Sequence, residues 1–233
     1  MRILSWNTAH GRGSSAALQL ADRVAAEVVL LQESFPPKKW GTAVAGSVVP
    51  GRKWGSWVLV RSGKLSEVEI DGFTGWVAAA TWQRSRKATL LASLHSPTSS
   101  ESSPRRSYID EARGAVDAIL NACPHQGKHV IGGDFNFKFF GPTNAENAKG
   151  SSQKEIATMK HFAGLGFANV WADTHPGAAL PQTLRWTKDR TIPYHCDGLL
   201  VRPFVASDAI CEVLSSDFIH RHSDHNAVLA VID

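Results

Sequence analysis

The chain has 233 residues, a length that suits one α/β domain with a sizeable core, and we expect a single domain over residues 1–233. With 43% hydrophobic and 20% charged residues, the composition is that of an ordinary globular protein. We find neither a signal peptide nor an uncharged apolar run long enough to span a bilayer, so we expect a soluble, cytoplasmic protein without membrane insertion.

The charge and the cysteines restrict the class of partner and of site. The formal net charge of +4 and the pI of about 9.1 favour a polyanionic partner. The basic residues form small clusters at Lys38-Lys39, Arg52-Lys53, Arg84 to Lys87 and Arg105-Arg106. These clusters form either a phosphate-binding face or ordinary solvated surface. Three cysteines without paired spacing indicate neither a disulfide framework nor a zinc site. A monomer is the expected oligomeric state.

The apolar pattern alternates between strand and helix along the chain. Residues 1–6 and 28–33 are typical of strands, and apolar residues at helical spacing predict a helix over 14–27 between them. Short strands, mostly antiparallel, are predicted at 56–63, 65–73, 76–84 and 88–96. Helices are predicted at 107–123 and 152–166, and further strands at 129–133, 195–202, 209–214 and 225–233. Two sheets packed face to face with helices outside account for this order.

Polar side chains end or interrupt many of these apolar strands. They are Asn7, Glu33, His95, Asp134, Asn136, Asp197 and the run Ser223-Asp224-His225. Because strand ends and their loops gather at the rims of a two-sheet fold, these groups are candidates for one pocket. Most of them offer oxygen atoms, which favours Mg²⁺ or Mn²⁺ over zinc as the bound ion.

The segments "SWN", "LLQE", "LHSP", "GDFN", "CDGLLV" and "SDH", in this order, resemble the signature of the endonuclease/exonuclease/phosphatase superfamily, which includes deoxyribonuclease I and exonuclease III. The resemblance extends from Asn7 to His225. It implies a four-layer α/β sandwich with two mixed, mostly antiparallel sheets, and metal-dependent cleavage of phosphate esters.

The resemblance also implies a role for each matching residue. Glu33 would be the principal metal ligand, with Asn7 beside it and Asp224 on the metal side. Asp134 would orient or deprotonate the attacking water, and Asn136 would hold that water or the phosphorane oxygens. His225, oriented by Asp197, would contact the scissile phosphate, and His95 would contact the phosphate or assist the leaving oxygen. Taken singly, these residues are also explained by turns, caps or strand ends, and His95 by a hydrogen-bonded structural histidine.

Three further candidates for substrate binding lie in "TLRWTKDRTIPYHCD". Arg185 could grip a phosphate and Trp186 could stack on a base, with His195 nearby, although a buried tryptophan beside a strand-end arginine explains the pattern as well.

The substrate is the least determined part of the prediction. Our leading hypothesis is a phosphodiesterase that depends on Mg²⁺ or Mn²⁺ and hydrolyses DNA or RNA. The alternatives are a phosphomonoesterase acting on a soluble or lipid phosphate, and a non-catalytic module that binds nucleic acid. The Trp-Arg-x-Asp-Tyr pattern of abasic-site endonucleases and the Pro-x-Trp-Cys-Asp-Arg pattern of inositol-polyphosphate 5-phosphatases are both missing, although Cys196-Asp197 overlaps the second.

Overall fold

The computed structural model describes residues 1–38, 40–84, 88–97, 107–123, 127–141, 150–185, 192 and 194–233. Trp186 and the basic residues Lys39, Arg86, Lys87, Arg105 and Arg106 lie outside the described residues. The strands are β1 (Arg2–Asn7), β2 (Val28–Ser34), β3 (Ala43–Val48), β4 (Gly55–Val60), β5 (Lys64–Val68), β6 (Val77–Gln83), β7 (Ala88–His95), β8 (Lys128–Asp134), β9 (Ala168–Asn169), β10 (Asp197–Arg202), β11 (Ile210–Leu214) and β12 (Ala227–Val231). The helices are α1 (Ser14–Arg23), α2 (Tyr108–Ala122), α3 (Gln153–Gly164), α4 (Val170–Thr174) and α5 (Asp217–His222), with a 3-10 turn η1 (Ala206–Asp208).

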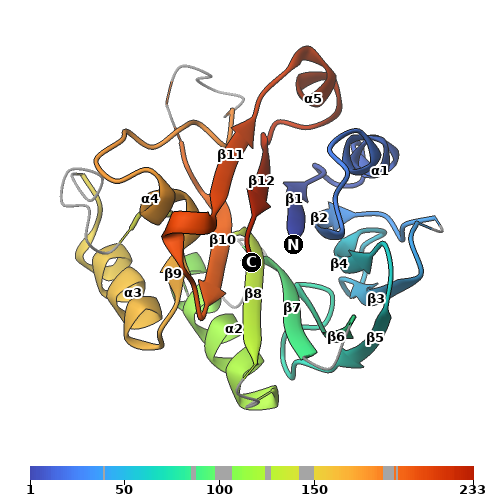
Figure 1. The fold of residues 1–233 in the computed structure, drawn as a ribbon, viewed down its shortest axis with the longest axis horizontal. Coiled ribbons are helices and arrows are strands. Elements are labelled where there is room, and N and C mark those ends of the chain that lie inside the picture. Colours follow the sequence, from blue (N-terminus) through green and yellow to red (C-terminus); the bar gives the residue numbers. More distant parts are fainter. Residues whose placement is uncertain are drawn as a thin grey trace.

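The strands form two six-stranded mixed sheets (Figure 1). The first has the order β11-β12-β1-β2-β4-β3, and the second has the order β5-β6-β7-β8-β10-β9. Only the pairs β1–β2 and β7–β8 are parallel among the strand pairs of the described residues. Each parallel pair is joined by a crossover that contains a helix, α1 in the first sheet and α2 in the second. The predicted mixed, mostly antiparallel sheets are therefore confirmed.

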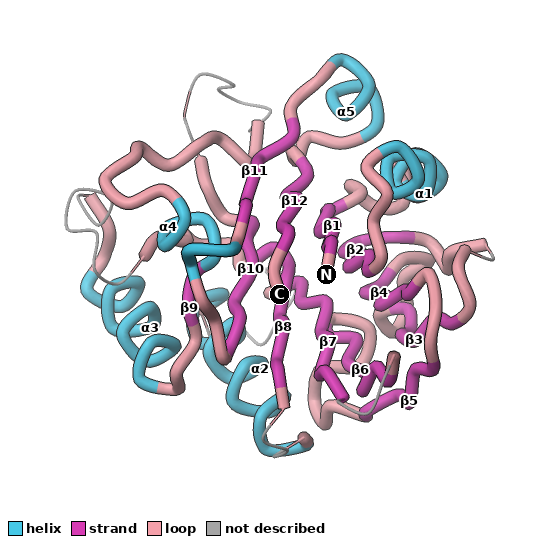
Figure 2. The backbone as a smooth tube through the Cα atoms, in the orientation of Figure 1, coloured by secondary structure: helices cyan, strands magenta, loops and turns pink. Residues whose placement is uncertain are grey.

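Side-chain alternation along the strands divides the core into three layers. In β2, Val28 and Leu30 face the second sheet, whereas Val29 and Leu31 pack under α1. In β7, Leu91 lies between the sheets and Leu90 packs towards α2 and α3. Because both faces of these strands are covered, they are apolar almost throughout. Figure 2 shows α1 and α5 on the side of the first sheet and α2 and α3 on the side of the second, which gives the four layers of the sandwich.

Several element boundaries differ from the sequence prediction. The first helix ends at Arg23 rather than continuing to residue 27, because Ala25 has a φ of +50° and the chain turns back to begin β2. The strand predicted at 65–73 ends at Val68. Strands β3 and β9, helices α4 and α5, and η1 were not predicted. No helix in the described parts of the chain is both long and apolar enough to cross a membrane.

Candidate functional site

Two glycines bring β8 close to both of its neighbours. A Cβ atom on Gly133 would lie 1.8 Å from the carbonyl oxygen of Leu94 in β7, and one on Gly132 would lie 2.7 Å from Leu30 Cδ1 in the other sheet. Only glycine fits at such distances. The segment "VIGGD" thus packs tightly against β7 in its own sheet and against the first sheet, and it ends at Asp134, which is 2% exposed.

Asp134 accepts hydrogen bonds from two site residues. Asn7 Nδ2, at the end of β1 in the first sheet, donates to Asp134 Oδ2 at 3.0 Å. The backbone N–H of Asn136 donates to Oδ1 at 2.9 Å. Asn136 has a left-handed φ of +55°, and its Nδ2 donates to the carbonyl oxygen of Ser96. Phe135, on the opposite side of the chain, stacks on Phe139 in the core, so the loop after β8 is anchored below the site.

Glu33 lies at the end of β2, where a φ of +50° interrupts the regular strand. Its Oε1 lies 3.2 Å from His95 Nε2, and its Oε2 accepts the backbone N–H of His10 at 2.8 Å. Burial pushes the pKa of Glu33 upward, but the imidazoles of His95, His10 and His225 outweigh this effect and the net pKa is lowered. Glu33, whose side chain is 12% exposed, is therefore an anion at neutral pH.

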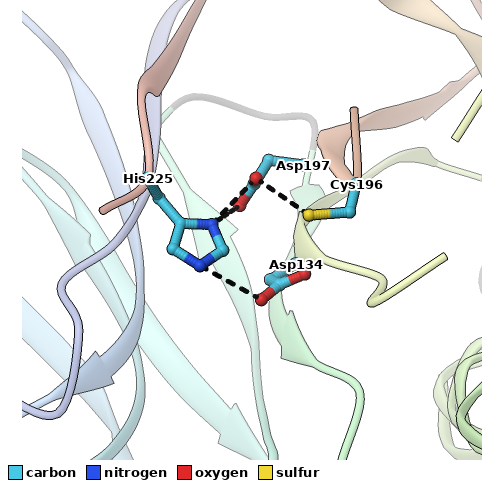
Figure 3. Close-up of side chains that lie close together, drawn as sticks. All are labelled: Asp134, Cys196, Asp197 and His225. Carbon is cyan, nitrogen blue, oxygen red and sulfur yellow. Dashed lines mark hydrogen bonds and ion pairs between the residues drawn. The ribbon is translucent and has the colours of Figure 1, made fainter. Parts of the chain in front are cut away.

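His225 and Asp197 form a buried pair (Figure 3). His225 Nδ1 lies 3.0 Å from Asp197 Oδ2, and the other ring nitrogen, Nε2, lies 3.8 Å from Asp134 Oδ2. Burial lowers the pKa of His225, but the two carboxylates raise it to about 10. Burial and the neighbouring Asp197 raise the pKa of Asp134. The protonated ring of His225 therefore lies beside Asp134, a carboxylate whose pKa is raised.

The seven predicted residues Asn7, Glu33, His95, Asp134, Asn136, Asp197 and His225 thus form one connected group. Asp134 is its centre, because His95 Nε2 and His225 Nε2 lie 3.9 Å and 3.8 Å from the same Oδ2 atom that Asn7 contacts. Asp224 lies beside this group, and its carboxylate pairs with Arg12 at 3.5 Å.

The other candidates have structural contacts. The Arg185 guanidinium donates to the carbonyl oxygen of Ser223 and to Asn226 Oδ1, and its backbone N–H donates to the Asp224 carbonyl oxygen. These hydrogen bonds of Arg185 therefore hold the loop that carries His225 in place. His195 is 1% exposed, packs against Trp171 and has a pKa lowered to about 4 by burial, so it is neutral. Trp186 lies outside the described residues.

Two features of the site were missed by sequence reasoning. The Cys196 thiol donates a hydrogen bond to Asp197 Oδ2 at 3.4 Å. The only signal for this contact in the sequence is the position of Cys196 directly before Asp197. An aromatic wall surrounds His95, with ring centroids of Trp54 and Trp76 at 5.8 Å and 5.3 Å. His10 lies 5.2 Å from Trp54 on the same wall. The abundance of tryptophan in the first half of the chain was the only signal for this wall.

The donor set fits a hard divalent cation. The partly exposed Glu33 and the buried Asp134 are carboxylates joined through His95, and Asn7 adds an amide oxygen that also accepts the N–H of Ala9 at 2.9 Å. Carboxylate and amide oxygens are the ligand types that Mg²⁺ and Mn²⁺ prefer. Buried carboxylates also cost free energy unless a cation or hydrogen bonds compensate them.

Comparison with known proteins assigns the family. The model of the Endonuclease/Exonuclease/phosphatase family matches residues 4–225. The chain belongs to this family. The match includes every residue of the connected group around Asp134, and it confirms the resemblance seen in the sequence. No curated protein matches the chain.

Solved structures of other proteins share this family fold. The 3′-5′ exonuclease NExo from Neisseria meningitidis is 19% identical, with a TM-score of 0.73, and the alignment covers 100% of both chains. An AP endonuclease from Archaeoglobus fulgidus is 15% identical, with a TM-score of 0.71 over 100% of this chain and 99% of that one. The endonuclease domain of TRAS1, a telomere-specific non-LTR retrotransposon, is 17% identical, with a TM-score of 0.70 over 99% and 97%. At these identities the likeness establishes the fold.

Proposed function

We propose that this protein is a divalent-metal-dependent phosphodiesterase that hydrolyses nucleic acid. The observation that carries the proposal is that the Asn7 amide and the imidazoles of His95 and His225 converge on one oxygen of Asp134. His95 also contacts the Glu33 carboxylate. Phosphodiester hydrolysis needs such a set, because an anionic substrate repels the nucleophile and the transition state gains further negative charge.

Glu33 and Asn7 would hold Mg²⁺ or Mn²⁺, with Asp224 on the metal side. When bound, the ion would supply positive charge against the phosphate and its transition state. The lowered pKa of Glu33 supports this role, because it keeps a charged oxygen ligand ready at neutral pH.

The chain's own residues would move protons and position the phosphate. Asp134 would accept the proton of the attacking water, and its raised pKa brings its basicity closer to neutral pH. Asn136 would hold the water or the phosphorane oxygens. His225 would donate a charged hydrogen bond to the phosphate, since Asp197 fixes its Nδ1 and leaves Nε2 directed to the site. His95 would contact the phosphate or assist the leaving oxygen.

Nucleic acid is the substrate class supported by two independent observations. The net charge of +4 favours a polyanion, and the solved structures that share the fold are described as nucleases. Release of a terminal phosphate is the second candidate, because NExo with product DNA hairpin is described as a 3′ phosphatase. A single domain, a monomeric state and a cytoplasmic location stay predictions.

A substrate panel tests the proposal. Purified protein is incubated with plasmid, single-stranded DNA, RNA and phosphate monoesters, each with Mg²⁺, Mn²⁺ or EDTA. We expect strand cleavage that EDTA abolishes. Asp134→Ala and His225→Ala should each lower the rate by roughly 10²- to 10⁴-fold with the fold retained. The matched controls are exposed residues of the same types, Asp208→Ala and His220→Ala, which should retain activity.

The outcomes separate the candidates. Phosphate release from monoesters without strand cleavage would favour the phosphomonoesterase. Binding without turnover would leave a nucleic-acid-binding module. Near-native activity of Asp134→Ala would remove this residue from the mechanism.

A further inference from the structure

Cys196 belongs to a buried cluster of four residues, and the proposed hydrolysis uses the other three, Asp134, Asp197 and His225. One ligand atom from each of Asp134, Cys196, Asp197 and His225 lies within 4.8 Å of the others, and all four residues are buried (Figure 3). The sulfur atom faces both carboxylates in Figure 3. Hydrolysis assisted by a hard cation uses oxygen and imidazole groups, so the thiol is outside the ligand types that it needs, although it donates a hydrogen bond to Asp197 Oδ2.

The ligand types form a set different from that of Glu33 and Asn7. One thiol, one imidazole and two carboxylates are ligands typical of Zn²⁺, and a thiolate selects soft or borderline cations over Mg²⁺. Tetrahedral zinc ligands lie about 3.5 Å from one another, given bond lengths near 2.0–2.3 Å. The ligand atoms lie within 4.8 Å of one another, so binding of one ion requires the longest separations to contract by up to roughly 1.3 Å.

Rigid elements hold the four side chains. Asp134 and Asp197 are directly opposed residues of the antiparallel strands β8 and β10. The Cys196 N–H donates to Thr183 Oγ1 at 2.9 Å, and the Cys196 carbonyl oxygen accepts the N–H of Phe135. His225 is held by the contact of its own N–H with Ser223 Oγ at 3.0 Å. The cluster is thus largely formed before any ion arrives, which lowers the cost of ordering its ligands.

We propose that Cys196, His225, Asp134 and Asp197 form a binding site for a thiophilic divalent cation such as Zn²⁺, with a ligand set that does not include Glu33 or Asn7, and that its occupation inhibits hydrolysis. Binding releases two protons to solvent, the thiol proton of Cys196 and the ring proton of the His225 nitrogen that binds the cation, and it breaks the His225–Asp197 contact. It also engages Asp134 and His225, which the reaction requires. The inhibitory half of this inference rests on the proposed function, and the binding half does not.

Co²⁺ is the probe for binding, because a thiolate ligand gives it a charge-transfer band in the near ultraviolet. The full-length protein is titrated with Co²⁺ in excess Mg²⁺, and bound Co²⁺ is then displaced with Zn²⁺. We expect the band in the wild type and in the matched controls Cys123→Ser and Cys211→Ser, whose cysteines are buried elsewhere in the core. The band should be lost in Cys196→Ser and Cys196→Ala. Circular dichroism of the metal-free variants shows which of the two is folded and can be scored.

No band in the wild type, or a band that survives in the folded Cys196 variants, would overturn the site.

Inhibition is measured as the Zn²⁺ concentration that halves each variant's own Mg²⁺-supported cleavage rate. Cys196→Ser should raise it by at least about tenfold, since even the loss of an outer partner of a ligand weakens metal binding that much. Equal inhibition of the two proteins would overturn the inhibitory role. If no substrate is cleaved, the proposed function fails, while the Co²⁺ band still decides the metal site.

Discussion

The side-chain amide of Asn7 donates to Oδ2 of Asp134 at 3.0 Å, and this bond joins the two sheets at the candidate site. Asn7 ends β1 of the first sheet and Asp134 ends β8 of the second. Both residues are buried, so the hydrogen bond forms away from solvent competition. The bond therefore couples the position of the Asp134 carboxylate to the packing of the two sheets.

Replacement of Asn7 tests this coupling in metal-free protein. Asn7→Ala removes the donor to a buried carboxylate and should lower the free energy of unfolding by about 1–3 kcal/mol. Asn7→Asp places a second carboxylate beside Asp134 and should cost more at pH 7.5, about 3–5 kcal/mol. Because protonation relieves like-charge repulsion, the deficit of Asn7→Asp relative to Asn7→Ala should shrink as the pH falls to 5. Urea unfolding in EDTA at both pH values measures this, and a deficit independent of pH would contradict it.

Asp197 and His225 should act as one unit in catalysis. Asp197→Asn keeps the shape of the side chain but removes the charge that fixes the imidazole, and it should lower kcat/KM by about 10²- to 10⁴-fold, as should His225→Ala. Residues that act as a unit have non-additive effects, so the double variant should be close to the worse single variant. Rates with the best substrate of the panel measure this. Multiplicative losses would show that the two residues act independently.

Local signals made most of the site predictable. Asp134, Glu33 and His95 each follow a run of apolar residues, and a polar residue in that place is costly unless the fold provides partners. The convergence of the seven residues on one point depends on long-range strand order, which only the family resemblance supplied. Cys196 was not identified as a site residue because its neighbour Asp134 is distant in the sequence and comes beside it only through the pairing of β8 with β10.

The missed elements lack strong local patterns. Strand β3, "AVAGSV", is rich in small residues with low strand propensity, and its pairing with β4 stabilises it. Helices α4 and α5 have 5 and 6 residues, too few to show a helical period. Helix α1 was predicted too long because Ala25 adopts a left-handed conformation without a glycine to mark the turn.

Gly133 should tolerate no side chain. In Gly133→Ala the new Cβ would meet the Leu94 carbonyl oxygen at 1.8 Å, inside the β7–β8 pairing, so one strand must move. We expect a loss of at least about 3 kcal/mol in the free energy of unfolding, the upper end for an overpacked core. Gly164→Ala is the matched control, because this glycine ends α3 with no atom within 4 Å of the added Cβ. It should be neutral or stabilise by up to about 1 kcal/mol. Equal stability of the two variants would contradict the predicted close contact.

His195 should make the protein sensitive to mild acid. Burial lowers its pKa from 6.5 to about 4, so between these values His195 holds fewer protons in the folded protein than in the unfolded chain. Stability should therefore fall as the pH drops from 6.5 to 4, by up to about 3 kcal/mol from this residue. The raised pKa values of Asp134 and Asp173 act in the opposite direction and are common to the wild type and the comparison variant. The raised pKa of His225 contributes no slope in this window, because that residue is protonated in the folded protein throughout and its linkage lies above pH 6.5. Urea unfolding in EDTA at pH 6.5, 5.5 and 4.5 measures the effect.

His195→Gln is the comparison variant for this measurement. The glutamine amide can still donate to the Pro181 carbonyl oxygen, which lies 2.8 Å from His195 Nδ1, but it does not titrate. The variant should therefore lose most of the acid-dependent slope above pH 4.5. Below this pH, buried carboxylates with lowered pKa values such as Glu33 add a second loss of stability as they protonate, so the comparison is confined to the higher window. An unchanged slope in His195→Gln would assign the acid sensitivity to other groups and show that His195 protonates without cost in the folded protein.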